Sequence, residues 1–101
     1  MSIKFEWDAN KAASNLIKHR VSFETATRTF ADPFLLMVQD RFENGELRWQ
    51  SLGMVDSHLV LLVAHTVGED DKGTEVLRII SARKADSKER KRYEQDRETR
   101  G

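Results

Sequence analysis

Three consecutive side chains that can carry positive charge, Lys18, His19 and Arg20, close the first predicted helix. A helix C-terminus attracts positive charge because its peptide dipoles are aligned, so the triplet could simply match that dipole. The alternative is that the triplet binds an anion. An imidazole at such a site suits proton transfer, because its unperturbed pKa is about 6.5.

A second candidate, Arg78, lies in an apolar predicted strand, on the face that also carries Val76 and Ile80. A guanidinium that is buried without a partner costs on the order of several kcal/mol. Arg78 therefore needs either a carboxylate from a neighbouring strand or an anionic ligand. Arg48 is a further candidate for the polar face, because it is predicted to face the same way as Glu46 on a hairpin strand.

Positive charge gathers near the end of the chain. Residues 81–101 carry 8 Lys or Arg against 5 Asp or Glu, whereas residues 1–80 carry 9 against 12. This asymmetry favours a phosphate-binding rim, although Asp86 and Glu89 interrupt the run and a solvated helix with internal ion pairs is the alternative. The cations of the run are Arg83, Lys84, Lys88, Arg90, Lys91 and Arg92.

If such a cationic surface cuts RNA, the chemistry needs no metal ion. The ribose 2′-hydroxyl attacks the adjacent phosphate when one group takes its proton, another protonates the leaving 5′-oxygen, and fixed cations neutralise the developing charge. His19 is the candidate for proton transfer. The candidates for charge stabilisation are Lys18, Arg78 and Arg83, and those that could assist binding or proton transfer are Glu89 and Tyr93.

The other two histidines do not suggest a metal site. His58 and His65 are seven residues apart on one predicted strand, and this odd separation sends their side chains to opposite faces. We expect His58 to be solvated at a turn and His65 to be hydrogen-bonded within the core. The chain has no cysteine, so it has neither a disulfide nor a thiolate metal site, and we expect no metal and no other cofactor.

Length and composition are typical of one soluble domain spanning residues 1–101. Hydrophobic residues make up 39% of the chain and charged residues 34%, with a formal net charge of +0. No apolar run approaches the ~18 residues that a membrane helix needs, and residues 1–4 lack the apolar run of a signal peptide. We therefore expect a cytoplasmic protein without a membrane partner.

The periodicity of the first third predicts a strand and two helices. Residues 3–7 alternate between apolar and polar, and Asp8 can cap a helix running to about Lys18. Ser22 can cap a second helix, and Asp32-Pro33 ends it because proline disfavours a helical residue before it.

The remaining pattern predicts four strands and a final charged helix. The strands cover residues 34–38, 46–55, 58–67 and 74–82, and Asn44-Gly45 predicts a hairpin between the first two. The third of them is apolar on both faces and should lie centrally in the sheet. Asp86 and Glu89 begin a helix that runs to about residue 98 and has Tyr93 as its only large apolar residue. The predicted fold class is α+β, in the order β-α-α-β-β-β-β-α, with two helices on one face of an antiparallel meander.

An ordered set of residues from position 5 to position 93 resembles the BrnT family, the toxins of type II toxin-antitoxin modules. The set includes Phe5-Glu6-Trp7-Asp8, Lys11, Asn15, Lys18-His19, residues 21–24, Ala26, residues 30–33, Arg48, Gly53, residues 78–85, Glu89-Arg90 and Tyr93.

This resemblance implies a RelE-like fold and a ribonuclease that cleaves RNA without metal and arrests translation. It also implies a BrnA-like antitoxin with a ribbon-helix-helix domain, through which the complex would bind operator DNA. Arg78 and Arg83 would bind the scissile phosphate, with Lys18 or His19 positioning it or transferring protons. The family's polar motif residues fall on Lys18, His19, Arg48, Arg78, Arg83, Glu89 and Tyr93.

One position departs from the family pattern. Arg20 stands where the family usually has glycine after the Lys-His pair, a residue suited to a left-handed turn. Either the turn is remodelled, or Arg20 tolerates a strain of ~1 kcal/mol and adds charge beside the site. The substitution therefore leaves open whether this chain has lost its activity.

A function of a different class remains open on the same residues. The basic rim could belong to a non-catalytic interaction module that binds an acidic antitoxin segment, or DNA within a repressor complex. The same cations serve both functions, so growth arrest on expression is the observation that separates them.

Overall fold

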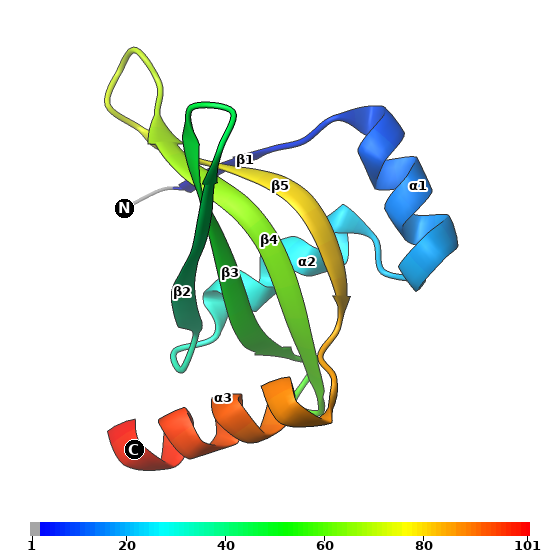
Figure 1. Cartoon of the computed structure of the whole chain (residues 1–101), viewed down its shortest axis with the longest axis vertical. Coiled ribbons are helices and arrows are strands. Elements are labelled where there is room, and N and C mark those ends of the chain that lie inside the picture. Colours follow the sequence, from blue (N-terminus) through cyan, green and yellow to red (C-terminus); the bar gives the residue numbers. More distant parts are fainter. Residues whose placement is uncertain (1–2) are drawn as a thin grey trace.

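A five-stranded sheet with helices on both faces forms the fold in the computed structural model, which describes residues 3–101 (Figure 1). This result confirms the predicted α+β class and element order. Met1 and Ser2, part of the segment used above to argue against a signal peptide, lie outside the described residues. The elements are β1 (Ile3–Glu6), α1 (Ala9–His19), α2 (Phe23–Thr27), the 3₁₀ turn η1 (Arg28–Ala31), β2 (Leu36–Glu43), β3 (Glu46–Val55), β4 (Leu59–Glu69), β5 (Glu75–Lys84) and α3 (Ser87–Arg100).

The strands are ordered β1-β5-β4-β3-β2, and β2 to β5 form the predicted antiparallel meander. The expectation of a wholly antiparallel sheet is wrong, because β1 pairs with β5 in parallel. The chain leaves β1, passes through the two N-terminal helices and completes the meander before β5 returns beside β1 in the same direction. The doubly apolar β4 lies at the centre, as predicted.

Local signals fix most element boundaries. The Asp8 side chain accepts from the backbone N–H groups of Asn10 and Lys11, and Ser22 caps α2. Asn44 and Gly45 both have positive φ, at 53° and 77°, as a two-residue hairpin turn requires. Some boundaries differ from prediction: the second helix tightens into η1 after Thr27, and β2 starts two residues later and extends to Glu43. The strands β4 and β5 each end two residues later than predicted, at Glu69 and Lys84.

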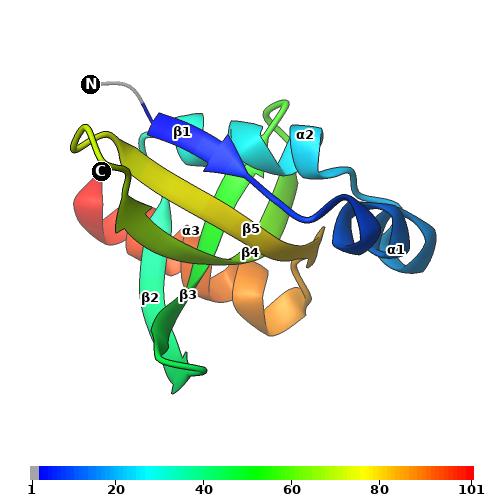
Figure 2. The same ribbon diagram turned by 90° about the horizontal axis from the view of Figure 1, so that it is seen from above.

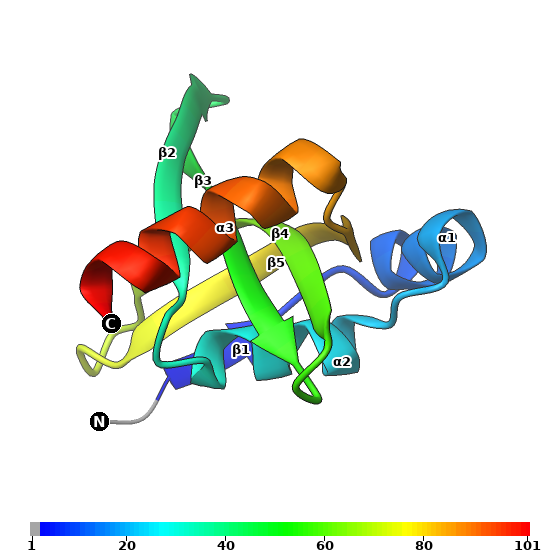
Figure 3. The same cartoon turned by 90° about the horizontal axis from the view of Figure 1, so that it is seen from below.

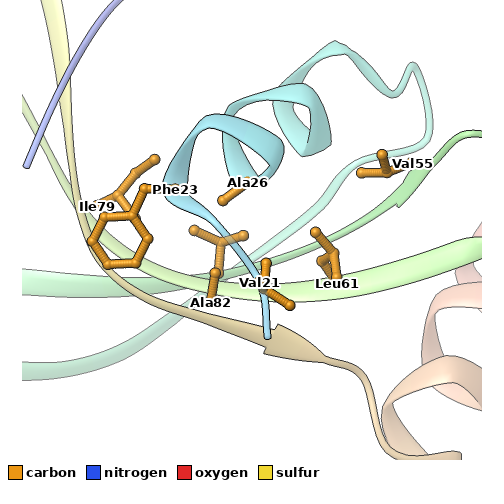
Figure 4. Close-up of a cluster of buried hydrophobic side chains, with 8 residues drawn as sticks. Val21, Phe23, Ala26, Val55, Leu61, Ile79 and Ala82 are labelled. Atoms are coloured by element: carbon orange, nitrogen blue, oxygen red, sulfur yellow. The ribbon is translucent and has the colours of Figure 1, made fainter. Parts of the chain in front are cut away.

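One hydrophobic core lies between the sheet and the N-terminal helices. Phe23 and Ala26 are fully buried on α2, and they pack with Leu61 and Val63 of β4 and with Ile79 of β5 (Figure 4). Figure 2 shows α2 on one side of the sheet and α3 on the other. In the described part of the chain, no helix is long and apolar enough to cross a membrane.

The second core lies on the opposite face, under α3 (Figure 3). Leu52, Val60 and Leu62 pack there with Tyr93, the only large apolar residue of α3, and Tyr93 is 0% exposed. A long polar helix is therefore docked on the sheet through one buried aromatic side chain. Contacts within the chain are therefore sufficient to explain the docking of α3.

Hydrogen bonds complete this anchor. The Tyr93 hydroxyl donates to the Asp32 carboxylate, which also accepts from the backbone N–H groups of Phe34 and Met54. Burial, followed by the hydrogen bond to Asp32, raises the pKa of Tyr93 to about 12. Burial opposes ionisation of Asp32, but the three donated hydrogen bonds outweigh it and hold the pKa of that carboxyl below its usual value.

His65 is a hydrogen-bonded core residue, as the sequence predicts. It is 0% exposed, its Nε2 lies 2.8 Å from the Ser51 hydroxyl, and its Nδ1 lies 3.3 Å from the carbonyl oxygen of Thr66. The ring also packs edge-on against Phe30. In the tautomer that satisfies both contacts, Nδ1–H donates to Thr66 and Nε2 accepts from Ser51.

This burial predicts sensitivity to mild acid. Burial lowers the pKa of His65, against the smaller opposing effect of its hydrogen bond to Thr66. The unfolded chain therefore binds the proton first, and the stabilisation present above the unfolded pKa of about 6.5 is lost as the pH falls towards the folded value. Urea unfolding at about pH 7.5 and about pH 5.5 should show a larger acid-induced loss in the wild-type protein than in His65→Gln. Equal losses in the two proteins would contradict this account.

Candidate active site and RNA interface

A β-bulge in β5 brings the two arginines of this strand to one face of the sheet. Arg78 and Arg83 are five residues apart, so strict alternation would place them on opposite faces. The pairing with β4 shifts between Ala64 and His65, which leaves Ile80 as an extra residue of β5. Because Thr66 pairs with Arg78 and Leu62 with Arg83, and these partners are four residues apart, both arginines lie on the α3 side.

Arg83 is held at the junction of β5 and α3. Its two terminal nitrogens donate to the two carboxylate oxygens of Glu89, at 2.8 Å and 2.9 Å. Glu89 also accepts from the backbone N–H of Asp86, within the predicted capping box that begins α3. The hydrogen bond from Arg83 is the main cause that keeps the pKa of Glu89 below its usual value. Glu89 is therefore a charged group that orients Arg83.

Arg78 and Arg48 lie further along the same face, near the tip of the β2–β3 hairpin. Arg78 forms an ion pair with Glu46, in which both side chains are about 40% exposed, at 41% and 42%. Arg48 is more buried, with 16% of its side chain exposed, and its Nε lies 3.9 Å from a Glu43 oxygen. That separation is too long for a hydrogen bond, and the buried Nε of Arg48 has no acceptor among the described residues.

Half-exposed residues that the sequence analysis did not select lie between these two groups of arginines. Gln50 pairs with Ala64, and Ala64 pairs with Ser81, so the three lie side by side across β3, β4 and β5. The face of Gln50 could be predicted from the sequence, because it lies two residues after Arg48 on β3, whereas the face of Ser81 could be predicted only if the bulge were known. We call this part of the α3-side face the open strip; it comprises Arg48, Gln50, Ala64, Thr66, Arg78, Ser81 and Arg83.

Asn15 fixes α1 beside the end of β5. Its side-chain amide donates to the carbonyl oxygens of Val21 and Ala82, and its oxygen accepts from the backbone N–H of Ala82. The Asn15 side chain therefore makes the hydrogen bonds to Ala82 that a neighbouring strand would otherwise make, at a point of β5 beyond the end of its pairing with β1. Lys18 and His19 follow Asn15 by three and four residues, so they lie one helical turn further on the same side of α1. Lys18 is exposed and His19 is partly buried.

Arg20 adopts the left-handed conformation that the family glycine would favour, with φ 60° and ψ 26°. Its backbone N–H donates to the carbonyl oxygen of Leu16 at 2.9 Å, which closes the helix. The turn is therefore retained, and Arg20 carries the expected strain.

Removing that strain should stabilise the protein. We expect Arg20→Gly to raise the free energy of unfolding by about 1 kcal/mol, because glycine meets no Cβ penalty in this conformation. For a domain of this length the midpoint temperature should rise by about 4–8 °C. Arg20→Ala is the control, because it keeps the Cβ and should give no such gain; a lower midpoint for Arg20→Gly would contradict the argument.

The predicted cations of α3 are exposed, and none of them is in an ion pair among residues 3–101. Lys88 and Arg90 occupy the first turn, where the helix dipole disfavours positive charge. Helix stability does not explain this placement. The residues concerned are Lys84, just before the helix, and Lys88, Arg90, Lys91 and Arg92 within it.

The structure thus brings some predicted site residues together and separates others. Arg83 and Glu89 meet at one end of the open strip, where α3 begins, while Arg48 and Arg78 lie at the other end. Arg78 and Arg83 share a face but are about 15 Å apart along β5. Tyr93 lies outside the strip, because it is fully buried and its hydroxyl is directed to Asp32. Within residues 3–101, no three His, Asp or Glu side chains are grouped as a metal site.

Comparison with known proteins identifies the relatives of this fold. A family model described as the ribonuclease toxin BrnT of type II toxin-antitoxin systems matches residues 7–89. The crystal structure of the Brucella abortus ribonuclease toxin BrnT is similar, with a TM-score of 0.66 and 22% identity over 85% of this chain and 100% of that chain. At this identity the structural match shows a common fold. No curated protein matches significantly. Because the family match covers most of the chain, this protein belongs to the BrnT family of ribonuclease toxins of type II toxin-antitoxin systems.

Proposed function

We propose that the protein is a metal-independent endoribonuclease toxin that acts in the cytoplasm and arrests translation by cutting RNA. The observation that carries the proposal is the bulge in β5, which turns Arg83 towards the same face as Arg48 and Arg78 in a chain of a ribonuclease family. We extend the proposal to a RelE-like mode of action, in which cations on a sheet face bind the RNA backbone.

The proposed reaction transfers a phosphoryl group within the RNA. The 2′-hydroxyl loses its proton to a base, its oxygen bonds to phosphorus, and the bond from phosphorus to the 5′-oxygen breaks. A proton then reaches the 5′-oxygen, which leaves a 2′,3′-cyclic phosphate and a 5′-hydroxyl. In our proposal Arg83 stabilises the charge on the phosphate, and Lys18 or His19 positions the phosphate or transfers the proton.

The ion pairs of the arginines are compatible with phosphate binding. A guanidinium has five N–H donors; Arg83 uses two of them on Glu89 and one on the carbonyl oxygen of Lys84, which leaves two for a phosphate. Fixed carboxylates also keep the arginines oriented before RNA arrives, so less side-chain entropy is lost on binding. Glu46 and Glu89, the carboxylates that contact Arg78 and Arg83, are occupied by these cations, which supports chemistry based on cations of the protein.

The exposed cations of α3 support a role in RNA binding. Because the helix dipole disfavours positive charge in the first turns, their position suggests a partner with negative charge. In our proposal Arg20, Arg48, Lys84, Lys88, Arg90, Lys91 and Arg92 contact the RNA backbone outside the scissile phosphate.

We further propose a BrnA-like ribbon-helix-helix antitoxin as the neutralising partner, with operator DNA bound only through it. Membership of a toxin-antitoxin family implies an antitoxin, and the cationic end of the open strip suits an acidic antitoxin segment. An antitoxin that covers Arg83 would block access of RNA.

The competing proposal is a non-catalytic module of a repressor complex. The pairing of Arg78 with Glu46 and of Arg83 with Glu89 favours it, because paired arginines can serve a structural purpose alone. Induced expression separates the two functions. We expect growth arrest that is relieved by co-expression of the adjacent antitoxin gene and absent for Arg83→Ala. Harmless expression of the wild-type protein at the same level would favour the module.

A further inference from the structure

We infer that the open strip contains two phosphate subsites for one single-stranded RNA segment, with Arg83 at the first and Arg48 together with Arg78 at the second. The inference rests on the proposed ribonuclease function and specifies its substrate. The RNA must be long enough to reach from one subsite to the other.

Arg78 and Arg83 are well separated along β5. Each strand residue advances the chain by about 3.3 Å, and one of the five steps from Arg78 to Arg83 passes through the bulged Ile80, so their Cα atoms are roughly 15 Å apart. Each side chain is also held by a carboxylate of a different element, Glu46 of β3 for Arg78 and Glu89 of α3 for Arg83. These carboxylates keep the two guanidinium groups at opposite ends of the strip, so each guanidinium would bind a different phosphate.

The end of the strip near the β2–β3 hairpin turn carries two arginines in one row of the sheet. Thr66 of β4 pairs with Arg78 of β5. Trp49 of β3 pairs with His65, so the preceding residue, Arg48, lies opposite Thr66. Arg48, Thr66 and Arg78 therefore form one row across the sheet. Arg48 has only a distant carboxylate at 3.9 Å and an Nε without an acceptor. The buried Nε is closed to an anion from outside, but within residues 3–101 the terminal nitrogens of Arg48 donate to no other group, so they are the donors that the second subsite retains.

Polar side chains lie between the two ends of the strip. Gln50 and Ser81 lie half-exposed in the row between Arg83 and the row of Arg48 and Arg78. An amide and a hydroxyl can each donate and accept, as base edges and ribose hydroxyls require. Bases present these edges to a protein when they are unpaired, so we assign the strip to single-stranded RNA.

Carboxylates near Arg78 set the expected strength of the second subsite. A pocket at this end is lined by Glu6, Glu46 and Thr66 together with Arg78. The acidic groups compete with phosphate for the guanidinium, so the second subsite should be weaker than the first and should strengthen when Glu46 is neutralised.

Binding of uncleavable 2′-O-methyl RNA tests the inference directly. Fluorescence anisotropy is measured with oligonucleotides of increasing length, from a dinucleotide to a hexanucleotide, on wild type, Arg78→Ala, Glu46→Gln and Arg28→Ala. The wild-type affinity should rise abruptly, about tenfold, at the length that first spans both subsites. Arg78→Ala should lose this rise and retain the affinity for the dinucleotide, with a salt slope for the hexanucleotide that is smaller by about 0.7.

Two further variants make the result specific. Glu46→Gln should strengthen binding of the hexanucleotide alone, because Arg78 loses its competing carboxylate. Arg28→Ala should change nothing, since Arg28 pairs with Asp56 away from the strip. A uniform loss at every length in Arg78→Ala would indicate one shared phosphate, and no loss would indicate a structural ion pair; either result overturns the inference. Length-dependent binding without cleavage of ordinary RNA would instead overturn the proposed function and leave the two subsites standing.

Discussion

Replacing Arg83 by alanine is expected to lower the rate of RNA cleavage by a factor of about 10²–10³. The guanidinium of Arg83 is the cation that the proposed reaction places on the phosphate, where charge develops in the transition state. Its orientation comes from Glu89, which binds both terminal nitrogens. Arg83→Lys should recover only part of the rate, because an ammonium cannot form the same paired contact with Glu89 while donating to a phosphate.

The fold should survive this substitution. Side chains of Arg83 and Glu89 are 38% and 22% exposed, so the loss of their partly solvated ion pair should cost only about 1 kcal/mol. Arg28→Ala is the matched control, because it removes another exposed ion pair, the one with Asp56. Circular dichroism and thermal unfolding should show folded proteins in both cases. Cleavage by Arg83→Ala at the rate of Arg28→Ala would remove Arg83 from the active site.

Replacing Tyr93 by alanine is expected to have the largest effect on stability, a loss of about 3–5 kcal/mol. Tyr93 is fully buried and is the only large apolar residue with which α3 contacts Leu52, Val60 and Leu62. Tyr93→Phe keeps the ring but leaves Asp32 without its hydroxyl donor, and it should cost about 1–3 kcal/mol. Urea unfolding measures both losses.

Two comparisons make the Tyr93 prediction specific. Gln95→Ala changes an exposed residue of the same helix and should alter the free energy of unfolding by less than about 0.5 kcal/mol. In Asp32→Asn the effect of Tyr93→Phe should shrink, because the hydroxyl no longer faces a charged acceptor. If Tyr93→Ala unfolds at the same urea concentration as the wild type, α3 is held by other contacts and the proposed anchor is wrong.

The sequence predicted the parts of the fold that local chemistry determines. Asp8, Ser22 and the Asp86-Glu89 capping box begin the helices where expected, and Asn44-Gly45 forms the hairpin turn. The apolar pattern of β4 correctly predicted its central position, because a strand covered on both faces has no polar side. These signals are short-range, so neighbouring residues are sufficient to produce them.

Long-range pairing was not readable in the same way. The parallel contact of β1 with β5 depends on how the meander closes, and no local residue encodes it. The bulge at Ile80 reverses the alternation of β5, so face assignments on opposite sides of it could not be extrapolated from one another. The carboxylate partners Glu46 and Glu89 lie 32 and 6 residues from their arginines, and only the folded sheet selects Glu46 for Arg78.

The same contrast between local signals and long-range pairing applies to the candidate site residues. The cations were visible as charge patterns, but their grouping into two ends of one strip required the register of β3, β4 and β5. The position of Tyr93 in the family motif is equally compatible with a catalytic and with a packing role. Its burial and its hydrogen bond to Asp32, which only the folded structure shows, account for its role in holding α3.

The central claim is that cations of the protein, rather than a metal ion, support RNA cleavage at the open strip. The most direct measurement incubates the purified protein with single-stranded RNA in excess chelator and identifies the ends of the products. We predict fragments with 2′,3′-cyclic phosphate and 5′-hydroxyl ends from the wild-type protein, and intact RNA from Arg83→Ala. Intact RNA with the wild-type protein under these conditions, and cleavage only after a divalent cation is restored, would contradict the claim.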